Sequence, residues 1–229
     1  MISYWWTLDN MGIVFGLVML VILVFSAILH EVAHGFVADR LGDPTARLSG
    51  RLTLNPKKHI DPIMSIALPL ILILSGSPVI FGAAKPVPID PFNLRDGRKD
   101  VALVSLVGPL TNVVIAVVSA LILKLLNLAA PSFAGGPYDF IFFVVFPIFL
   151  TITQINLLLA IFNLIPIPPL DGSKIFALIL PEKQASVYLS LGSIGFFVIF
   201  FLLLFPIGGF SLGDLIFSLL SFSEKLLGV

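Results

Sequence analysis

The rarest ionisable side chains of this sequence meet in one short motif. The 229-residue chain contains three histidines and three glutamates, and two of these histidines and one glutamate form H-E-V-A-H at residues 30–34. On an α-helix, His30 and His34 project only about 40° apart, so both imidazoles can reach one metal ion. Glu31 projects about 60° from His34, where it can take a proton from water without binding the ion. The motif therefore indicates metal-assisted hydrolysis.

The sequence offers two candidates for a further ligand. A catalytic zinc usually has three protein ligands and an open position for water, so two imidazoles do not complete a site. Asp171 is the first candidate, because it precedes Gly172 in the turn-forming segment P-I-P-P-L-D-G that follows an apolar stretch. Its other possible role is that of a turn or capping residue. His59 is the second candidate and lies in the basic segment N-P-K-K-H. We rank Asp171 ahead of His59.

The composition places these residues in a membrane protein. Residues of the AVILMFWYC group make up 58% of the chain, charged residues make up only 11%, and the mean hydropathy is +1.11. Ordinary soluble domains carry roughly 25% charged residues. The 13 basic and 13 acidic residues leave no net positive charge to attract phosphates, so we expect no nucleic-acid partner. The absence of cysteine excludes disulfides, thiolate ligands and thiol catalysis.

Hydropathy predicts five spanning helices. About 20 mostly apolar residues are needed to cross a membrane core roughly 30 Å thick. The stretches that fit are 12–38, 100–126, 140–165, 187–205 and 210–226. The last is the weakest, because it is short and carries Asp214. We expect residues 1–229 to form a single membrane-embedded domain, an all-α polytopic protein with about five to six transmembrane helices.

Residues 62–90 predict a re-entrant hairpin. The turn signal S-G-S-P at 75–78 interrupts the apolar stretch, and basic residues flank both of its ends. Because positive residues gather on the cytoplasmic side, both ends should lie there, although a single crossing by residues 62–84 is the alternative. We expect the hairpin to finish as an extended strand through residues 86–89. Five crossings then place the N-terminus outside and the candidate site near the cytoplasmic side of a prokaryotic cell membrane.

The buried ionisable residues have two other interpretations. In the first they are core groups satisfied by hydrogen bonds, but each charge in lipid costs roughly 2.5 kcal/mol or more. A metal ion offsets that cost by supplying positive charge to a buried carboxylate. In the second the chain is a transporter or metal-ion channel, whose intramembrane His, Glu and Asp line an ion path. A channel does not explain why a glutamate directly follows the first of two histidines at i, i+4.

Several blocks of the sequence resemble the site-2 protease family of intramembrane zinc metalloproteases. The combination is specific, although H-E-x-x-H alone is not, and it covers most of residues 29–174. The matching blocks are H-E-V-A-H-G at 30–35, L-N-P-K-K-H-I-D-P at 54–62, G-A-A-K-P-V-P at 82–88, G-P-L-T-N at 108–112 and N-L-I-P through D-G at 163–172.

The resemblance implies a three-helix catalytic core with one zinc ion per chain. His30, His34 and Asp171 would bind the zinc, and Glu31 would be the catalytic base. The implied activity is hydrolysis of peptide bonds in or near transmembrane segments of membrane proteins, as in regulated intramembrane proteolysis. The chain has no room for a PDZ domain or a nucleotide-binding module, so we expect the short form of the family.

The expected partners are the lipid bilayer and a transmembrane protein or peptide substrate. A transmembrane helix hides its carbonyls in hydrogen bonds, so the substrate must unwind locally before it is cut. The edge of the strand expected near residues 79–89 could hold the unwound segment by strand addition.

Asn112 and Asn163 lie in or near predicted spanning helices, where an unpaired amide is costly. One possible role is interhelical hydrogen bonding, helped at Gly108 by close approach of the helices. The other, which the resemblance supports, is substrate alignment or support of the transition state near zinc. The sequence does not decide between them. Gln154 and Asn156 are expected to make packing contacts.

Overall fold

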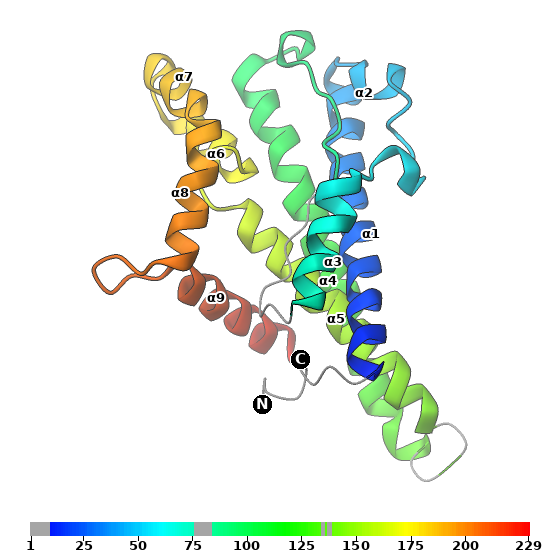
Figure 1. The fold of residues 1–229 in the computed structure, drawn as a ribbon. Helices are drawn as coiled ribbons and strands as arrows, with labels where there is room; N and C mark the ends of the chain where they lie inside the picture. The colour runs from blue at the N-terminus through cyan, green and yellow to red at the C-terminus, as the bar shows by residue number, and fades with distance from the viewer. Residues whose placement is uncertain (1–9, 76–83, 134–135, 137–138) are drawn as a thin grey trace.

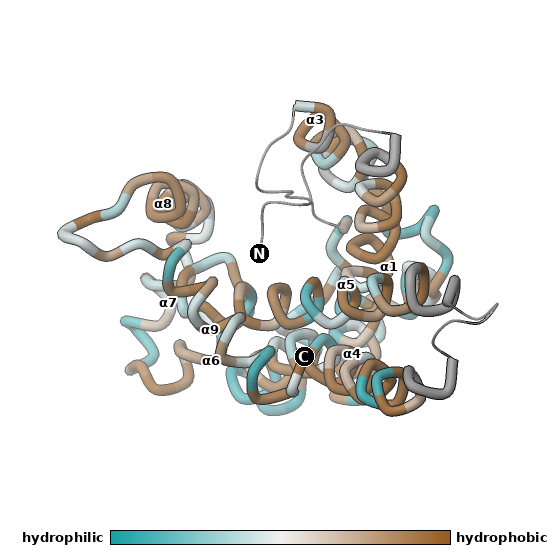
Figure 2. The backbone as a smooth tube through the Cα atoms, turned by 90° about the horizontal axis from the view of Figure 1, so that it is seen from below, coloured by the Kyte–Doolittle hydropathy of each residue, from teal (hydrophilic) through white to brown (hydrophobic). Residues whose placement is uncertain are grey.

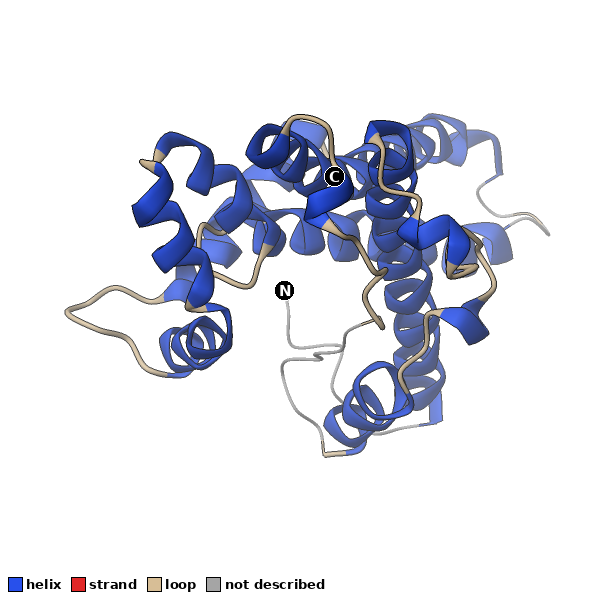
Figure 3. Cartoon of the chain, turned by 90° about the horizontal axis from the view of Figure 1, so that it is seen from above, coloured by secondary structure: helices blue, strands red, loops and turns tan. Residues whose placement is uncertain are grey.

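The computed structural model describes residues 10–75, 84–133, 136 and 139–229, and these residues are mostly helical (Figures 1 and 3). The helices in chain order are α1 (Asn10–Leu41), α2 (Thr45–Leu48), α3 (Leu68–Leu74), α4 (Gly97–Phe133), α5 (Asp139–Asn163), α6 (Asp171–Phe176), α7 (Glu182–Ser190), α8 (Gly192–Leu204) and α9 (Leu212–Leu227). A π-helical turn covers Pro62–Ala67, and 3-10 turns cover Pro56–Lys58, Pro91–Asn93 and Ala177–Ile179. The predicted helical fold class is confirmed.

Within the described residues, three helices are long and apolar enough to cross a membrane. The qualifying segments are Val14–Leu41 in α1, Gly97–Ala129 in α4 and Val144–Asn163 in α5. The shortest has 20 residues, which at 1.5 Å per residue gives about 30 Å, the thickness of the hydrocarbon core. α4 packs against α1 and α5, and α1 also contacts α5 (Figure 1). The three helices therefore form one bundle.

The predicted five to six spanning helices are not confirmed. The apolar stretch 187–205 is divided into α7 and α8, whose axes differ by 68°, so the pair supplies at most a fourth, bent span. The 13 residues of α8 extend only about 20 Å. At Gly195 a Cβ would overlap the Pro168 carbonyl, so α8 packs directly on the proline-rich segment that precedes α6. Hydropathy alone registers neither the bend nor this contact.

α9 is not among the helices of the described residues that are long and apolar enough to cross a membrane. It packs against α5 and α8, and in Figure 1 it runs obliquely beneath the lower end of α8. Its Glu224 Oε1 accepts a hydrogen bond of 2.8 Å from Gln154 Nε2 of α5. The chain end lies against α4, because a Cβ built on Gly228 would be 3.2 Å from Nζ of Lys124. The C-terminal end of α9 therefore lies beside Lys124 of α4.

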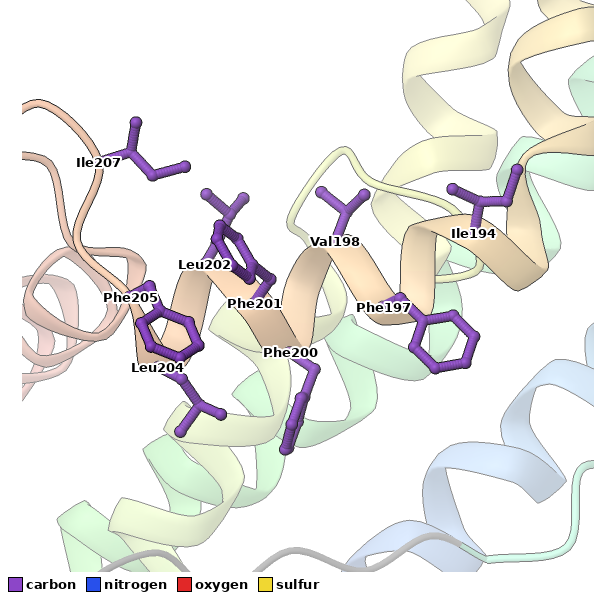
Figure 4. A pocket seen from close by; sticks show the side chains of 9 residues that line it. All are labelled: Ile194, Phe197, Val198, Phe200, Phe201, Leu202, Leu204, Phe205 and Ile207. Carbon is purple, nitrogen blue, oxygen red and sulfur yellow. The ribbon is translucent and has the colours of Figure 1, made fainter.

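The surface of α8 is apolar along its length. In Figure 2 this helix is coloured as hydrophobic, as are α1 and α3. Figure 4 shows an open apolar groove on α8. The groove is lined by Ile194, Phe197, Val198, Phe200, Phe201, Leu202, Leu204, Phe205 and Ile207. A contiguous apolar surface of this kind suits contact with lipid better than contact with water.

The predicted β hairpin is not confirmed. Its first arm is helical, because the π-helical turn Pro62–Ala67 continues directly into α3. In its second arm, residues 84–90 form no strand, and residues 76–83, which hold most of the predicted turn and part of the expected strand edge, lie outside the described residues. Pro86 and Pro88 help to explain the missing strand, because proline cannot donate a hydrogen bond to a neighbouring strand.

Asp43 joins the turn after α1 to the segment that precedes α4. Its carboxylate is fully buried and accepts hydrogen bonds from the Thr45 N–H (3.1 Å), the Thr45 hydroxyl, the Asp90 N–H (2.7 Å) and Asn93 Nδ2 (3.0 Å). Burial raises the pKa of Asp43, but the hydrogen bonds from Thr45, Asn93 and Asp90 outweigh burial and hold the pKa below its ordinary value. These donors therefore fix the connection between α1 and α4.

We expect this connection to weaken in acid. A carboxylate whose pKa is lowered by folding contributes stability above its unfolded pKa of 3.8 and loses it as the pH falls through the lower native pKa. The thermal midpoint of the detergent-solubilised protein should therefore drop below about pH 4. Asp43→Asn should lower the midpoint at neutral pH and show a smaller further drop in acid.

Asp96→Asn is the matched control, because the Asp96 side chain is 64% exposed, and its midpoint should follow the wild type at every pH. An Asp43→Asn profile that runs parallel to the wild type would contradict the assignment.

Candidate metal centre

Three buried side chains from α1 and α6 converge at one point in the bundle. Asp171 Oδ2 lies 3.2 Å from Nε2 of His30 and 3.1 Å from Nε2 of His34, and the two Nε2 atoms are 2.9 Å apart. The exposed fractions of the three residues are 6%, 6% and 8% for His30, His34 and Asp171. The structure thus brings together the three residues that the sequence ranked first as ligands.

His59, the alternative third ligand, is not part of this group. Its side chain is fully buried, and its Nε2 donates a hydrogen bond of 2.8 Å to the Thr53 carbonyl. The ring therefore closes the loop between α2 and the π-helical turn.

A tight turn after α5 delivers Asp171 to the imidazoles. At Gly172 a Cβ would overlap the Leu164 carbonyl and lie 2.7 Å from the Ile165 carbonyl oxygen, so the chain folds back on itself only with glycine there. α6 packs against α4, which fixes the height of this turn in the bundle. The second carboxylate oxygen of Asp171 accepts a hydrogen bond of 3.1 Å from Nζ of Lys174, one turn along α6.

Hydrogen bonds at Nδ1 determine the protonation of both rings. Nδ1 of His34 lies 2.7 Å from the Val104 carbonyl, which can only accept, so that nitrogen carries the proton. Nδ1 of His30 lies 2.6 Å from Asn112 Oδ1 and likewise donates. In the neutral rings both Nε2 atoms are then lone-pair donors. Two nitrogen lone pairs and a carboxylate oxygen face one another at this site.

That set of atoms fits a zinc ion. Three converging lone-pair donors repel each other unless a cation lies among them, and two imidazoles with one carboxylate are a known catalytic zinc set. Bond lengths of about 2.0–2.1 Å at tetrahedral angles separate ligand atoms by roughly 3.3 Å. The observed separations of 2.9, 3.1 and 3.2 Å are close to this value.

Asn112 belongs to a hydrogen-bonded chain that runs behind His30. Its Nδ2 donates to Asn156 Oδ1 (2.8 Å), and Asn156 Nδ2 donates to the Ser26 hydroxyl (2.9 Å), so α4, α5 and α1 are tied together. Asn112 and Asn156 are both fully buried. Both ends of the Asn112 amide are engaged, which favours the hydrogen-bonding role over direct contact with substrate. Sequence reasoning treated Asn156 only as a packing residue.

Replacing Asn112 with alanine should weaken zinc binding. The substitution removes the acceptor that orients His30 and its tautomer, and loss of such a partner typically costs about 10–100-fold in metal affinity. Competition with a chromogenic zinc chelator measures the change. Ser119→Ala is the control: Ser119 lies two turns further along α4, and its hydroxyl donates a hydrogen bond to the Phe149 carbonyl of α5 (2.7 Å). Equal zinc affinities for the two variants would disprove the role of Asn112.

Asn163 lies at the C-terminal end of α5. Its Nδ2 donates to the Leu159 carbonyl of its own helix (2.9 Å), so within the described residues this bond is local to α5. The predicted role of Asn163 in substrate alignment stays a prediction.

Glu31 is partly buried beside His30 and receives a hydrogen bond from a distant segment. The backbone N–H of Val87 donates to Glu31 Oε2 at 2.7 Å. No local sequence pattern reveals a bond between residues 56 positions apart. Glu31 is outside the set of converging ligand atoms, as the helical spacing predicts for a base.

The backbone of α4 closes over the imidazole rings at Gly108. A Cβ at this position would overlap the His34 ring and lie 2.6 Å from Cε1 of His30. The close helix approach predicted at Gly108 is therefore present, and it takes place directly against the two histidines.

Comparison with known proteins identifies the family. The protein-family model described as "Peptidase family M50" matches residues 138–206 of this chain. "Putative zinc metalloprotease YwhC" of Bacillus subtilis is 35% identical over 198 residues, which are 85% of this chain and 83% of that protein. "Putative zinc metalloprotease Rip2" of Mycobacterium tuberculosis is 33% identical over 180 residues, 78% of this chain and 62% of that protein. The Rip2 of Mycolicibacterium smegmatis is 35% identical over 149 residues, which are 65% of this chain and 52% of that protein.

No solved structure matches the chain significantly. The similarity to YwhC extends over most of both proteins, and together with the match to peptidase family M50 it confirms the resemblance to the site-2 proteases. The chain therefore belongs to peptidase family M50 and is a zinc metalloprotease.

Proposed function

We propose that the protein is an intramembrane endopeptidase that cuts membrane proteins in or near their transmembrane segments. In this proposal residues 1–229 form one membrane-embedded domain, His30, His34 and Asp171 hold zinc, and Glu31 is the catalytic base. The observation that carries the proposal is the convergence of the three ligand atoms inside a bundle of three membrane-length helices.

The depth of the site supports cleavage within the membrane. His34 lies seven residues before the end of the apolar segment Val14–Leu41, about 10 Å along the helix axis. Gly108, which covers the imidazoles, lies eleven residues into the segment Gly97–Ala129, about 16 Å from its start. A bond cut at this depth belongs to a substrate segment that has entered the bundle.

The chain's own groups account for the proton transfers of hydrolysis. A zinc ion held by His30, His34 and Asp171 would act as a Lewis acid, which polarises the scissile carbonyl and increases the acidity of water. Glu31 accepts a proton from the attacking water and returns it to the departing amine. Asn112 contributes by orienting His30, and Asn163 is proposed to align the substrate backbone.

We also propose that the site faces the cytoplasm and that the N-terminus lies outside. The basic residues near the end of α1 and the start of α4 gather at the same end of the bundle (Figure 1). They are Arg40 in the last turn of α1, Arg47 in α2, Arg95 just before α4, and Arg98 and Lys99 in its first turn. The positive-inside rule assigns such an end to the cytoplasm.

Cleavage of a defined substrate in liposomes tests the proposed function. The purified protein is reconstituted with a synthetic single-span peptide, and the products are mapped by mass spectrometry. Cuts in or next to the apolar segment are expected, they should stop when a chelator removes the metal, and zinc should restore them. Cuts confined to soluble segments far from the membrane, or cuts that persist without metal, would refute intramembrane proteolysis.

A further inference from the structure

The orientation of the catalytic base depends on one backbone hydrogen bond. Glutamate has a long, flexible side chain, and the Val87 N–H fixes Glu31 by binding Oε2 at 2.7 Å. Hydrogen bonds to an ionised carboxylate are shorter and stronger than neutral ones. Contacts that fix the position of Val87 therefore also fix the carboxylate of Glu31.

The sequence around Val87 makes this donor unique in its segment. Pro86 and Pro88 have no N–H, so Val87 carries the one backbone donor between Lys85 and Ile89. A residue that precedes proline is restricted to extended conformations, which applies to both Lys85 and Val87. The segment is therefore stiff, and it presents a single N–H toward α1.

Arg51 holds this segment from the side opposite to α1. Only 9% of Arg51 is exposed, and its Nη2 donates to the carbonyls of Lys85 (2.8 Å) and Pro86 (3.2 Å). The Lys85 N–H in turn donates to the His59 carbonyl at 2.7 Å. Because the His59 ring bonds the Thr53 carbonyl (2.8 Å), Arg51 and His59 belong to one closed loop.

α1 completes the support from the other side. At Gly35, one turn beyond Glu31, a Cβ would lie 2.8 Å from Val87 Cγ1 and 2.9 Å from the side chains of Ala46 and Leu52. Val87 therefore packs directly on the helix that carries the base. The segment is held between α1 and the loop that begins at Arg51.

We propose that Arg51 is a positioning residue for catalysis, which acts on Glu31 through the backbone of Lys85 and Pro86 and the N–H of Val87. This inference rests on the proposed function and adds a residue to it. Arg51 is outside the set of converging ligand atoms. Its loss lets Val87 shift, and a shift of about 1 Å in a catalytic group can cost on the order of 100-fold in rate.

Kinetics of three arginine variants test the proposal in the liposome assay. Arg51→Met should lower kcat by roughly 10–100-fold, with KM and zinc content within about twofold of the wild type. Arg51→Lys keeps one cationic donor and should recover part of kcat. Arg47→Met is the matched control: Arg47 lies in α2, four residues before Arg51, but its side chain is 63% exposed and pairs with Asp39, so kcat should be unchanged.

An Arg51→Met variant with wild-type kcat, or with its loss confined to KM or zinc content, overturns the proposal. A wild-type protein that cuts no peptide refutes the proposed function instead, so the two failures are distinguishable.

Hydrogen exchange of the Val87 amide tests the proposal even if one of the Arg51 variants does not fold. In protein labelled with 15N-valine, the Val87 amide should exchange slowly in the wild type and in Arg47→Met. It should exchange at least about tenfold faster in Arg51→Met, because the carbonyls that Arg51 holds are released, and faster by a smaller factor in Arg51→Lys, which keeps one cationic donor. Unchanged exchange in Arg51→Lys would overturn the proposal.

Discussion

Replacing Glu31 with glutamine should abolish peptide hydrolysis and leave the zinc content unchanged. Glutamine has the shape of glutamate, and its Oε1 can still accept the Val87 N–H that now binds Oε2. It cannot take the proton of the attacking water, and loss of a general base costs about 10²–10⁴-fold in rate. The zinc should stay because Glu31 is outside the converging set of ligand atoms.

The measurement pairs a cleavage assay with metal analysis of the same samples. Glu182→Gln is the control, because Glu182 lies on the surface in α7, and it should cut like the wild type. Loss of zinc from Glu31→Gln would show that Glu31 acts as a ligand. Retained cleavage within about threefold of the wild type would show that another group serves as the base.

Replacing Gly108 with alanine should empty the metal site. The added methyl group would overlap the His34 ring and lie 2.6 Å from Cε1 of His30, so both imidazoles must move or α4 must withdraw. Outer partners of metal ligands typically contribute about 10–100-fold in affinity, and displacement of two ligands at once should exceed roughly 100-fold. Cleavage should fall with the zinc content.

Gly213→Ala is the matched control for this change. Gly213 lies in α9, where a Cβ would meet only the Ser211 hydroxyl, at the ordinary contact distance of 3.6 Å. Zinc binding and cleavage should be unaffected there. Full zinc occupancy in Gly108→Ala would mean that the imidazoles do not lie beneath α4 as the structure places them.

The convergence of His30, His34 and Asp171 could be predicted because local rules decide its geometry. Helical periodicity alone puts His30 and His34 on one face of α1. The prolines and Gly172 predict where α5 ends and where the chain turns, and this turn carries Asp171 to the imidazoles. Both the helical spacing of the histidines and the turn at Asp171 can be inferred from residues that are close in the sequence.

The support around the site could not be predicted in the same way. The bond from Val87 to Glu31 joins segments 56 residues apart, and the contacts of Arg51 are with backbone carbonyls, which every residue has. Asn156 is buried on α5 among many apolar positions, and only the packing of α4 and α1 shows that it links Asn112 to Ser26. Tertiary structure, not local pattern, determines these partners.

Within the described residues the predicted five to six spanning helices are not confirmed, for a related reason. Hydropathy counts apolar residues and does not register where a helix bends, as between α7 and α8, or where it packs across a neighbour, as α9 does on α5. The re-entrant strand was predicted from its flanking charges and its extended prolines. The same prolines prevent residues 84–90 from pairing as a regular strand.

Zinc-edge X-ray absorption on the metal-loaded protein tests the central claim most directly, with Asp171→Ala measured beside the wild type and Asp96→Ala as an exposed control. We predict one zinc per wild-type chain with two imidazole nitrogens and carboxylate oxygen at about 2.0–2.2 Å. Asp171→Ala should lose the carboxylate and most of its zinc affinity, whereas Asp96→Ala should match the wild type. Wild-type zinc binding and an unchanged spectrum in Asp171→Ala would contradict the account.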